Sequence, residues 1–227
     1  MPVIYLIRHA QASFGSRDYD KLSEQGEQQA VLLGKALAAR GVRPDLVVSG
    51  SMSRHLMTAQ LALAAAGLEG QAEVDVGFDE FDHEQVILAH KPAYRRRAVM
   101  LADLARTGNP HRAFQEMFSA ATERWMREDD GYTETFQAFA ERVEAAVQRT
   151  AGSLGKGGTA VVFTSGGPIS SVVSRILTDG GDGLWLKLSP LTINTAITKV
   201  LAGLSGLTVV SHNEHGHLDG TGMISYR

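Results

Sequence analysis

The sequence predicts an α/β protein: a three-layer sandwich with a mostly parallel sheet and a helical insertion. Short apolar runs alternate with helical patterns along most of the 227 residues, which is typical of a sheet built from βαβ units. One long helical stretch, about residues 84–128, interrupts this alternation. No internal repeat, low-complexity tract or linker divides the chain. We therefore expect a single domain over residues 1–227 that carries the stretch at 84–128 as a lid or side layer.

Six apolar runs are expected to form the strands of the sheet. Gly203 to Gly206 joins the last two runs, and glycines of this kind mark connections between elements. The expected strands cover residues 3–7, 46–48, 73–77, 159–164, 193–202 and 207–211.

Six helical segments lie between these runs. Ser23 is a suitable N-cap for the first helix, and Gly41 lies just past its end. Pro168 can open the last helix at its first position, where a backbone N–H is not needed. Gly108, Asn109 and Pro110 separate the two helices of the insertion. The expected helices cover residues 23–40, 52–66, 84–106, 110–128, 134–151 and 168–178.

The composition is that of an ordinary globular protein, with 44% apolar and 21% charged residues. The net charge of −3 favours neither nucleic acid nor an anionic membrane, so any anion site must be local. The absence of cysteine excludes disulfides, thiol chemistry and zinc–thiolate sites. No signal-like segment and no long apolar run is present. We expect a cytoplasmic enzyme without nucleic-acid or membrane partners. The sequence does not decide whether the protein is a monomer or a homo-oligomer.

The first expected strand runs directly into Arg8 and His9. Side chains at the carboxyl end of such a strand lie at the sheet edge where α/β proteins usually bind ligands. Arginine binds phosphate through a planar fork of donors. Histidine can attack phosphorus and hold the phosphoryl group covalently. The pair therefore suggests phosphoryl transfer through a phosphohistidine on His9.

Residues 4–30, IYLIRHAQASFGSRDYDKLSEQGEQQA, resemble the histidine phosphatase superfamily, which includes the cofactor-dependent phosphoglycerate mutases. The resemblance lies in Arg8-His9 after a strand, followed by Leu22-Ser23, Gly26 and Gln29-Ala30 at the start of a helix. It implies a phosphoglycerate mutase-like fold and a small phosphorylated substrate, and it implies neither a cofactor nor a metal.

Three further motifs follow in the order that the family shows. Ser49 to Ala59 resembles the family's second phosphate-binding segment, which implies that Arg54 binds phosphate. Glu80 best fits the acidic residue that protonates the leaving oxygen. Asp82 is a weaker candidate for this acid, and Asp79 is interpreted as solvated surface.

The fourth motif departs from the family. Strand, Gly-Gly turn and helix are in place at residues 161–169, but Ser165 occupies the position of the family's second histidine. The Ser165 hydroxyl and the amide of Gly166 can each donate a hydrogen bond to phosphate. Serine cannot supply the charge of an imidazolium. The family's usual asparagine also has no clear counterpart among Ser13, Phe14, Gly15 and Ser16.

Another histidine of the chain could take the place of the family's second histidine. His83 and His215 are the candidates. His217 matches the family's terminal histidine and is interpreted as structural; its spacing from His215 would also suit a metal, which we do not expect. The remaining histidines in helical segments are interpreted as ordinary helix or surface residues; they are His55, His90 and His111.

The sequence thus predicts a phosphatase that hydrolyses a phosphomonoester through His9. Two alternatives stay open. A phosphoglycerate mutase would return the phosphoryl group to a bound product. A catalytically weak protein that only binds a phosphorylated ligand would fit Ser165, although such a protein needs neither His9 nor Glu80.

Overall fold

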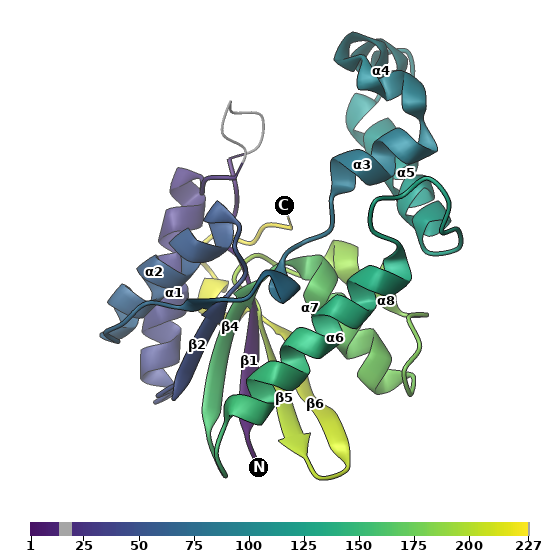
Figure 1. The fold of residues 1–227 in the computed structure, drawn as a ribbon. Coiled ribbons are helices and arrows are strands. Elements are labelled where there is room, and N and C mark those ends of the chain that lie inside the picture. Colours follow the sequence, from purple (N-terminus) through teal and green to yellow (C-terminus); the bar gives the residue numbers. More distant parts are fainter. Residues whose placement is uncertain (14–19, 227) are drawn as a thin grey trace. The chain divides into compact units, whose positions relative to one another are not determined.

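The computed structural model describes residues 1–13 and 20–226. The chain divides into two compact units, which are residues 1–80 with 142–227 and residues 81–141. Because neither unit is placed relative to the other, each is described by itself (Figure 1). The single-domain organisation with an insertion at 84–128 stays a prediction.

The first unit is built on a six-stranded sheet with the order β3-β2-β4-β1-β5-β6. The first four strands in this order are parallel to one another, and β5 and β6 add two antiparallel pairings. This confirms the predicted α/β class with a mostly parallel sheet. The strands are β1 (Val3–Arg8), β2 (Leu46–Ser49), β3 (Glu73–Val74), β4 (Thr159–Thr164), β5 (Ile197–Gly203) and β6 (Gly206–Glu214).

Helices cover both faces of this sheet, with α1 and α2 on one face and α6 and α7 on the other (Figure 1). The central strands β1 and β4 are therefore buried on both sides, which explains why they read as continuous apolar runs instead of alternating patterns. The helices of this unit are α1 (Glu24–Ala39), α2 (Ser53–Ala66), most of α6 (Phe136–Ser153), α7 (Gly166–Leu177) and α8 (Trp185–Leu188).

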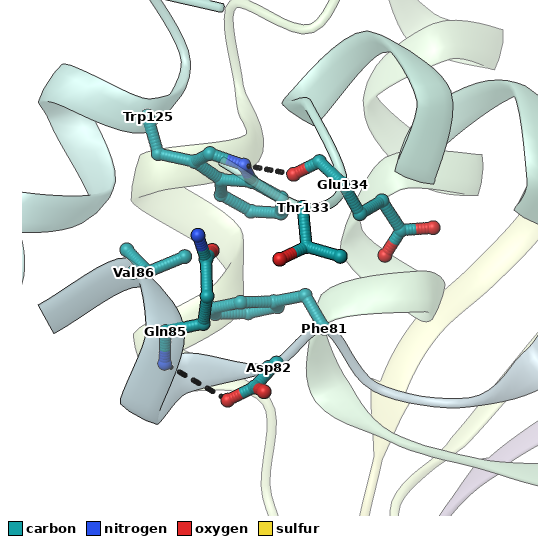
Figure 2. Close-up of a pocket in the computed structure, with 7 residues that line it drawn as sticks. All are labelled: Phe81, Asp82, Gln85, Val86, Trp125, Thr133 and Glu134. Atoms are coloured by element: carbon teal, nitrogen blue, oxygen red, sulfur yellow. Dashed lines mark hydrogen bonds between the residues drawn. The ribbon is translucent and has the colours of Figure 1, made fainter. Parts of the chain in front are cut away.

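The second unit contains α3 (His83–His90), α4 (Arg97–Ala105) and α5 (Pro110–Trp125). Its core is aromatic: the ring of Trp125 stacks on Phe81 with centroids 4.6 Å apart and lies 5.5 Å from Phe139. The Trp125 indole donates to the backbone oxygen of Glu134 at 2.8 Å, which satisfies its buried N–H. A small pocket opens beside this cluster (Figure 2), lined by Phe81, Asp82, Gln85, Val86, Trp125, Thr133 and Glu134.

Three predicted elements differ from the structure. The helix expected at 84–106 is two helices, because Pro92 has no N–H to continue α3 and starts a short 3₁₀ turn instead. The strand expected at 73–77 ends at Val74, where Asp75 begins another 3₁₀ turn by accepting from the Gly77 amide at 2.8 Å. The strand expected at 193–202 starts only at Ile197, since Thr195 has a φ of +61° and interrupts the extended backbone.

No helix within residues 1–13 and 20–226 combines the length and apolar character needed to cross a membrane.

The packing of α1 on α2 predicts the effect of replacing Gly34. A Cβ at Gly34 would lie 2.2 Å from the Ala62 backbone oxygen and 2.7 Å from the Ala65 Cβ. We expect Gly34→Ala to lower the free energy of unfolding by about 1–3 kcal/mol, because overpacking outweighs the better helix propensity of alanine. Urea denaturation measures this change.

Gly152→Ala in α6 is the matched control, since nothing lies within 4 Å of its Cβ position. The control should leave the stability unchanged or raise it by up to about 1 kcal/mol. Equal effects of the two substitutions would contradict the close packing of α1 on α2.

Candidate active site

Three parallel strands end at the same edge of the sheet, and this edge gathers the candidate residues. Arg8, the last residue of β1, pairs with Thr164, the last residue of β4. The backbone ladder continues one step further, since the amide of His9 donates to the Thr164 oxygen at 2.8 Å. On the other side of β4, the Gly50 amide donates to the Phe163 oxygen at 3.0 Å. The segments that follow β1, β2 and β4 therefore begin side by side.

His9 is buried and is held in a single tautomer. Its Nδ1 lies 2.7 Å from the backbone oxygen of Ala10. Because a carbonyl oxygen only accepts, Nδ1 carries the hydrogen, and the lone pair is left on Nε2. Burial lowers the pKa of His9 well below its usual value, and the charges of Arg54 and Arg8 lower it further. At neutral pH the ring is uncharged, and Nε2 carries no hydrogen.

Three buried polar side chains hold the backbone around His9. The amide group of Asn194 donates to the His9 oxygen at 3.0 Å. The Thr58 hydroxyl accepts from the Ala10 amide at 3.0 Å, and Gln29 accepts from the Gln11 amide at 2.8 Å. All three side chains are fully buried, so they hold the residues after β1 in one conformation. Thr58 and Gln29 lie in recognised motifs, whereas no motif of the sequence points to Asn194.

Arg54 is almost fully buried at the start of α2 and is paired with a carboxylate. Its Nη1 lies 2.6 Å from Oδ1 of Asp20. The other oxygen of Asp20 accepts from the Ser53 amide at 2.6 Å, so one carboxylate binds both the guanidinium and the helix N-terminus. The start of α2 is thus an anion-binding position. Sequence reasoning missed Asp20, which lies 34 residues from Arg54 along the chain.

Arg8 extends from the end of β1 toward the start of α7. Its Nη1 donates to the backbone oxygens of Thr192 and Tyr226. A Cβ at Gly166 would lie 3.6 Å from the Arg8 Nε, so the guanidinium runs beside the first residue of α7. The structure therefore brings the predicted residues Arg8 and Gly166 together.

Glu80 is fixed at the same helix N-terminus. Its Oε2 accepts from the Gly167 amide at 3.1 Å. A Cβ at Gly167 would lie 2.0 Å from Oε1 of Glu80, so a larger residue here would displace the Glu80 carboxylate. Of the other two acids, Asp82 accepts from the Gln85 amide and caps α3. Asp79 was expected to be solvated surface, but its carboxylate accepts hydrogen bonds from the amide and the hydroxyl of Ser51, each at 2.6 Å.

His55 was interpreted as an ordinary helix or surface residue, and the structure contradicts this. The side chain is fully buried, and its Nε2 lies 2.7 Å from the Ser165 hydroxyl. Its ring centroid lies 5.6 Å from that of His9. A signal was present in the sequence, because His55 shares a helix face with Thr58, Ala59 and Ala62 at helical spacing, and all are buried.

The other candidate histidines contact residues that were not predicted as parts of the site. The ring of His83 packs edge-on against Phe81, with centroids 5.6 Å apart. His215 donates from Nδ1 to the Asn213 oxygen at 2.7 Å, and His217 lies 3.0 Å from the Thr195 hydroxyl.

Two further expectations concern a metal site and the missing asparagine. In the part of the chain that the structure describes, no three His, Cys, Asp or Glu side chains converge on a possible metal position. Phe14, Gly15 and Ser16, considered for the family's asparagine, lie outside the described residues.

This fold and site define the class of protein. The chain matches the family model of the histidine phosphatase superfamily (branch 1) over residues 4–99 and 101–215. It belongs to this superfamily.

Curated relatives match a part of the chain. Phosphoglycerate mutase 1 of Saccharomyces cerevisiae is 33% identical over 72 residues. The 2,3-bisphosphoglycerate-dependent phosphoglycerate mutase of Thermobifida fusca is 36% identical over 75 residues. The aligned segments span 29% and 30% of this chain and the same shares of the two relatives.

Solved structures share the fold over almost the whole chain. YhfR of Bacillus stearothermophilus has a TM-score of 0.68 at 19% identity, covering 96% of this chain and 100% of its own. Phosphoserine phosphatase of Entamoeba histolytica, in complex with 3-phosphoglyceric acid, has a TM-score of 0.66 at 17% identity, with the same coverage. Phosphoglycerate mutase of Bacillus anthracis has a TM-score of 0.65 at 17% identity, covering 95% and 94%. The phosphoglycerate mutase-like fold is thereby confirmed.

The burial of His9 and His55 predicts their titration. Burial lowers the pKa of both rings well below 6.5, and Arg54 lowers both further. We expect their ¹⁵N chemical shifts to stay those of neutral imidazole from pH 8 down through 6.5, with assignments from His9→Asn and His55→Gln. An unfolded chain would take up protons near pH 6.5, so the protein should lose stability as the pH falls below that value. A midpoint at or above 6.5 for either ring would contradict the described electrostatics.

Proposed function

We propose that this protein hydrolyses a phosphomonoester, with His9 as the nucleophile. The observation that carries the proposal is the state of His9: a buried ring whose Nδ1 donates to the Ala10 oxygen and whose pKa is strongly lowered. Nε2 is then unprotonated at neutral pH, as attack on phosphorus requires. The hydrogen bond also fixes the ring orientation, which reduces the entropy lost on reaching the transition state.

The charge of the phosphoryl group would be balanced by residues from three segments. Arg8 ends β1, Arg54 lies in the first turn of α2, and Ser165 with the Gly166 amide opens α7. Guanidinium groups and helix-terminal amides are the donors that stabilise charge on transferring phosphoryl oxygens. Arg54 is paired with Asp20, so the phosphoryl group would replace this carboxylate at the guanidinium.

Glu80 would be the general acid. In the first step, His9 Nε2 forms a bond to phosphorus while the bond to the leaving oxygen breaks, and Glu80 gives that oxygen its proton. In the second step, Glu80 takes a proton from water, the water oxygen bonds to phosphorus, and the bond to Nε2 breaks. The Gly167 amide, 3.1 Å from Oε2, holds the carboxyl group at the start of α7 during both steps.

A mutase is the second candidate, because the curated relatives that match this chain over 72 and 75 residues are phosphoglycerate mutases. Incubation of the protein with 3-phosphoglycerate distinguishes the phosphatase from the mutase. The proposed phosphatase releases inorganic phosphate, whereas a mutase produces 2-phosphoglycerate. Since 3-phosphoglycerate need not be a substrate, a panel of phosphomonoesters complements it.

Replacing His9 tests the nucleophile. We expect the wild type, quenched during turnover of a ³²P-labelled phosphomonoester, to carry acid-labile and base-stable label. His9→Ala should carry none and should lose at least about 1,000-fold in kcat/KM, since it removes the covalent route. Retention of activity by His9→Ala would exclude the mechanism. Phosphate binding without turnover across the panel would instead favour a protein that only binds its ligand.

The acid role of Glu80 predicts a dependence on the leaving group. Glu80→Gln should lower kcat/KM for an alkyl phosphate by about 100-fold or more, because the alkoxide needs a proton as it departs. The loss should be much smaller for p-nitrophenyl phosphate, whose leaving group departs as an anion. Glu84→Gln, at an exposed carboxylate of the same type, is the control and should change neither rate. Equal losses on both substrates would argue against a proton donor at Glu80.

A further inference from the structure

His55 is a buried histidine that the proposed mechanism leaves without a role. It lies beside the proposed nucleophile, with the two ring centroids 5.6 Å apart and the planes tilted by 42°. Its Nε2 lies 2.7 Å from the hydroxyl of Ser165, the residue that stands where the family resemblance expects a histidine. Ser165 is the N-cap of α7, yet its hydroxyl makes no capping bond, so the hydroxyl is committed to His55 instead.

The other side of the His55 ring faces a carboxylate. Its Nδ1 has no hydrogen-bond partner within the described residues and lies 3.8 Å from Oδ1 of Asp79. The bonds from Ser51 hold that carboxylate in place. A Cβ at Gly50 would lie 2.3 Å from Nδ1 and 2.7 Å from Oδ1, so only glycine leaves room for the ring and the carboxylate together. The backbone is thus adapted to place Asp79, His55 and Ser165 in a row.

This row can exist in two protonation states. In the neutral state, Nδ1–H points toward the Asp79 carboxylate, and Nε2 accepts from the Ser165 hydroxyl. In the protonated state, Nε2–H donates to the Ser165 oxygen, and the hydroxyl hydrogen turns away from the ring, free to donate elsewhere. In both states Nε2 stays within hydrogen-bond distance of Ser165 and Nδ1–H faces the Asp79 carboxylate, so the switch between them needs no movement of the backbone.

We propose that Asp79, His55 and Ser165 form a proton relay that supplies the positive charge missing from Ser165 when a dianionic phosphoryl group lies next to His9. One proton from solvent is taken up by His55, and no bond to phosphorus is made or broken in this step. The Ser165 hydroxyl then donates toward the phosphoryl group. His55 acts through Ser165 and is therefore a positioning residue. The inference rests on the proposed function for the place of the phosphoryl group.

The charges that face His55 determine the direction of the switch. Burial opposes protonation most strongly and Arg54 on the same helix opposes it further, so the pKa of His55 lies well below its usual value. The Asp79 carboxylate, 3.8 Å from Nδ1, is the opposite charge that would hold a protonated ring. His9, neutral because of its own lowered pKa, adds no opposing charge. A dianion beside His9 is therefore the added charge that raises the pKa of His55 and draws in the proton.

Isothermal titration calorimetry with sulfate tests the relay without requiring catalysis. Sulfate stays dianionic from pH 5 to 8, so any proton taken up comes to the protein. The number of protons follows from the binding enthalpy in buffers of different ionisation enthalpy at pH 7. We expect wild type to take up about one proton per bound sulfate. His55→Gln should take up none and should bind roughly 10- to 100-fold more weakly.

Two further variants separate the relay from a structural role for His55. Asp79→Asn keeps an acceptor for Ser51 but loses the charge, so proton uptake should shift to lower pH. His55→Ala combined with Ser165→His removes one ring and places another at the start of α7, within the same buried space. This double variant should regain sulfate affinity and phosphatase rate that His55→Ala alone loses. His90→Gln, in α3, is the control and should match the wild type.

The outcomes distinguish this inference from the proposed function. Sulfate binding without proton uptake, or no sulfate binding, overturns the relay even if His9 still becomes labelled during turnover. Proton uptake that survives His55→Gln overturns it as well, because another group is then titrating. Proton uptake that is lost in His55→Gln supports the relay. If His9 carries no label, the proposed function fails, and the relay remains as an anion-binding device.

Discussion

The backbone pairing of β1 with β4 is the constraint on which the site depends. Arg8 and Thr164 end the two strands opposite each other, and one more hydrogen bond carries the pairing to His9. The residue that follows Thr164 at the end of β4 is Ser165, the N-cap of α7. Backbone hydrogen bonds thereby set groups that are far apart in the sequence side by side.

Burial then gives these groups their chemical character. A histidine that is removed from water and faced by arginines loses its proton, so burial leaves His9 uncharged, as the proposed attack on phosphorus requires. Burying so many polar groups would be costly if they were unpaired. The backbone that follows β1 is paired instead, because it makes hydrogen bonds with the side chains of Asn194, Thr58 and Gln29. Stability and reactivity therefore come from the same contacts.

The sequence predicted those parts of the site that are local. The continuous apolar run before Arg8 and His9, and the Gly-Gly turn that opens α7, could be recognised because each signal lies within a few residues. Pairings across long sequence separations could not be recognised: Asp20 with Arg54, and His55 with Ser165, are 34 and 110 residues apart. His55 was missed because a histidine within an Ala- and Leu-rich helix has no distinctive local pattern. The spacing of the apolar residues on α2 could have predicted that His55 is buried, but not its contact with Ser165. Pro92 was overlooked inside an otherwise helical pattern, although its missing N–H ends α3.

The central claim is that His9 attacks phosphorus through Nε2, because Nδ1 is committed to the Ala10 oxygen. The most direct measurement is ¹⁵N–³¹P correlation NMR on protein labelled with ¹⁵N-histidine and trapped at alkaline pH during turnover of a phosphomonoester. The account predicts one phosphorus nucleus coupled to Nε2 of a single histidine, assigned as His9 by the loss of the signal in His9→Ala. Coupling to Nδ1, or to a histidine other than His9, would contradict it.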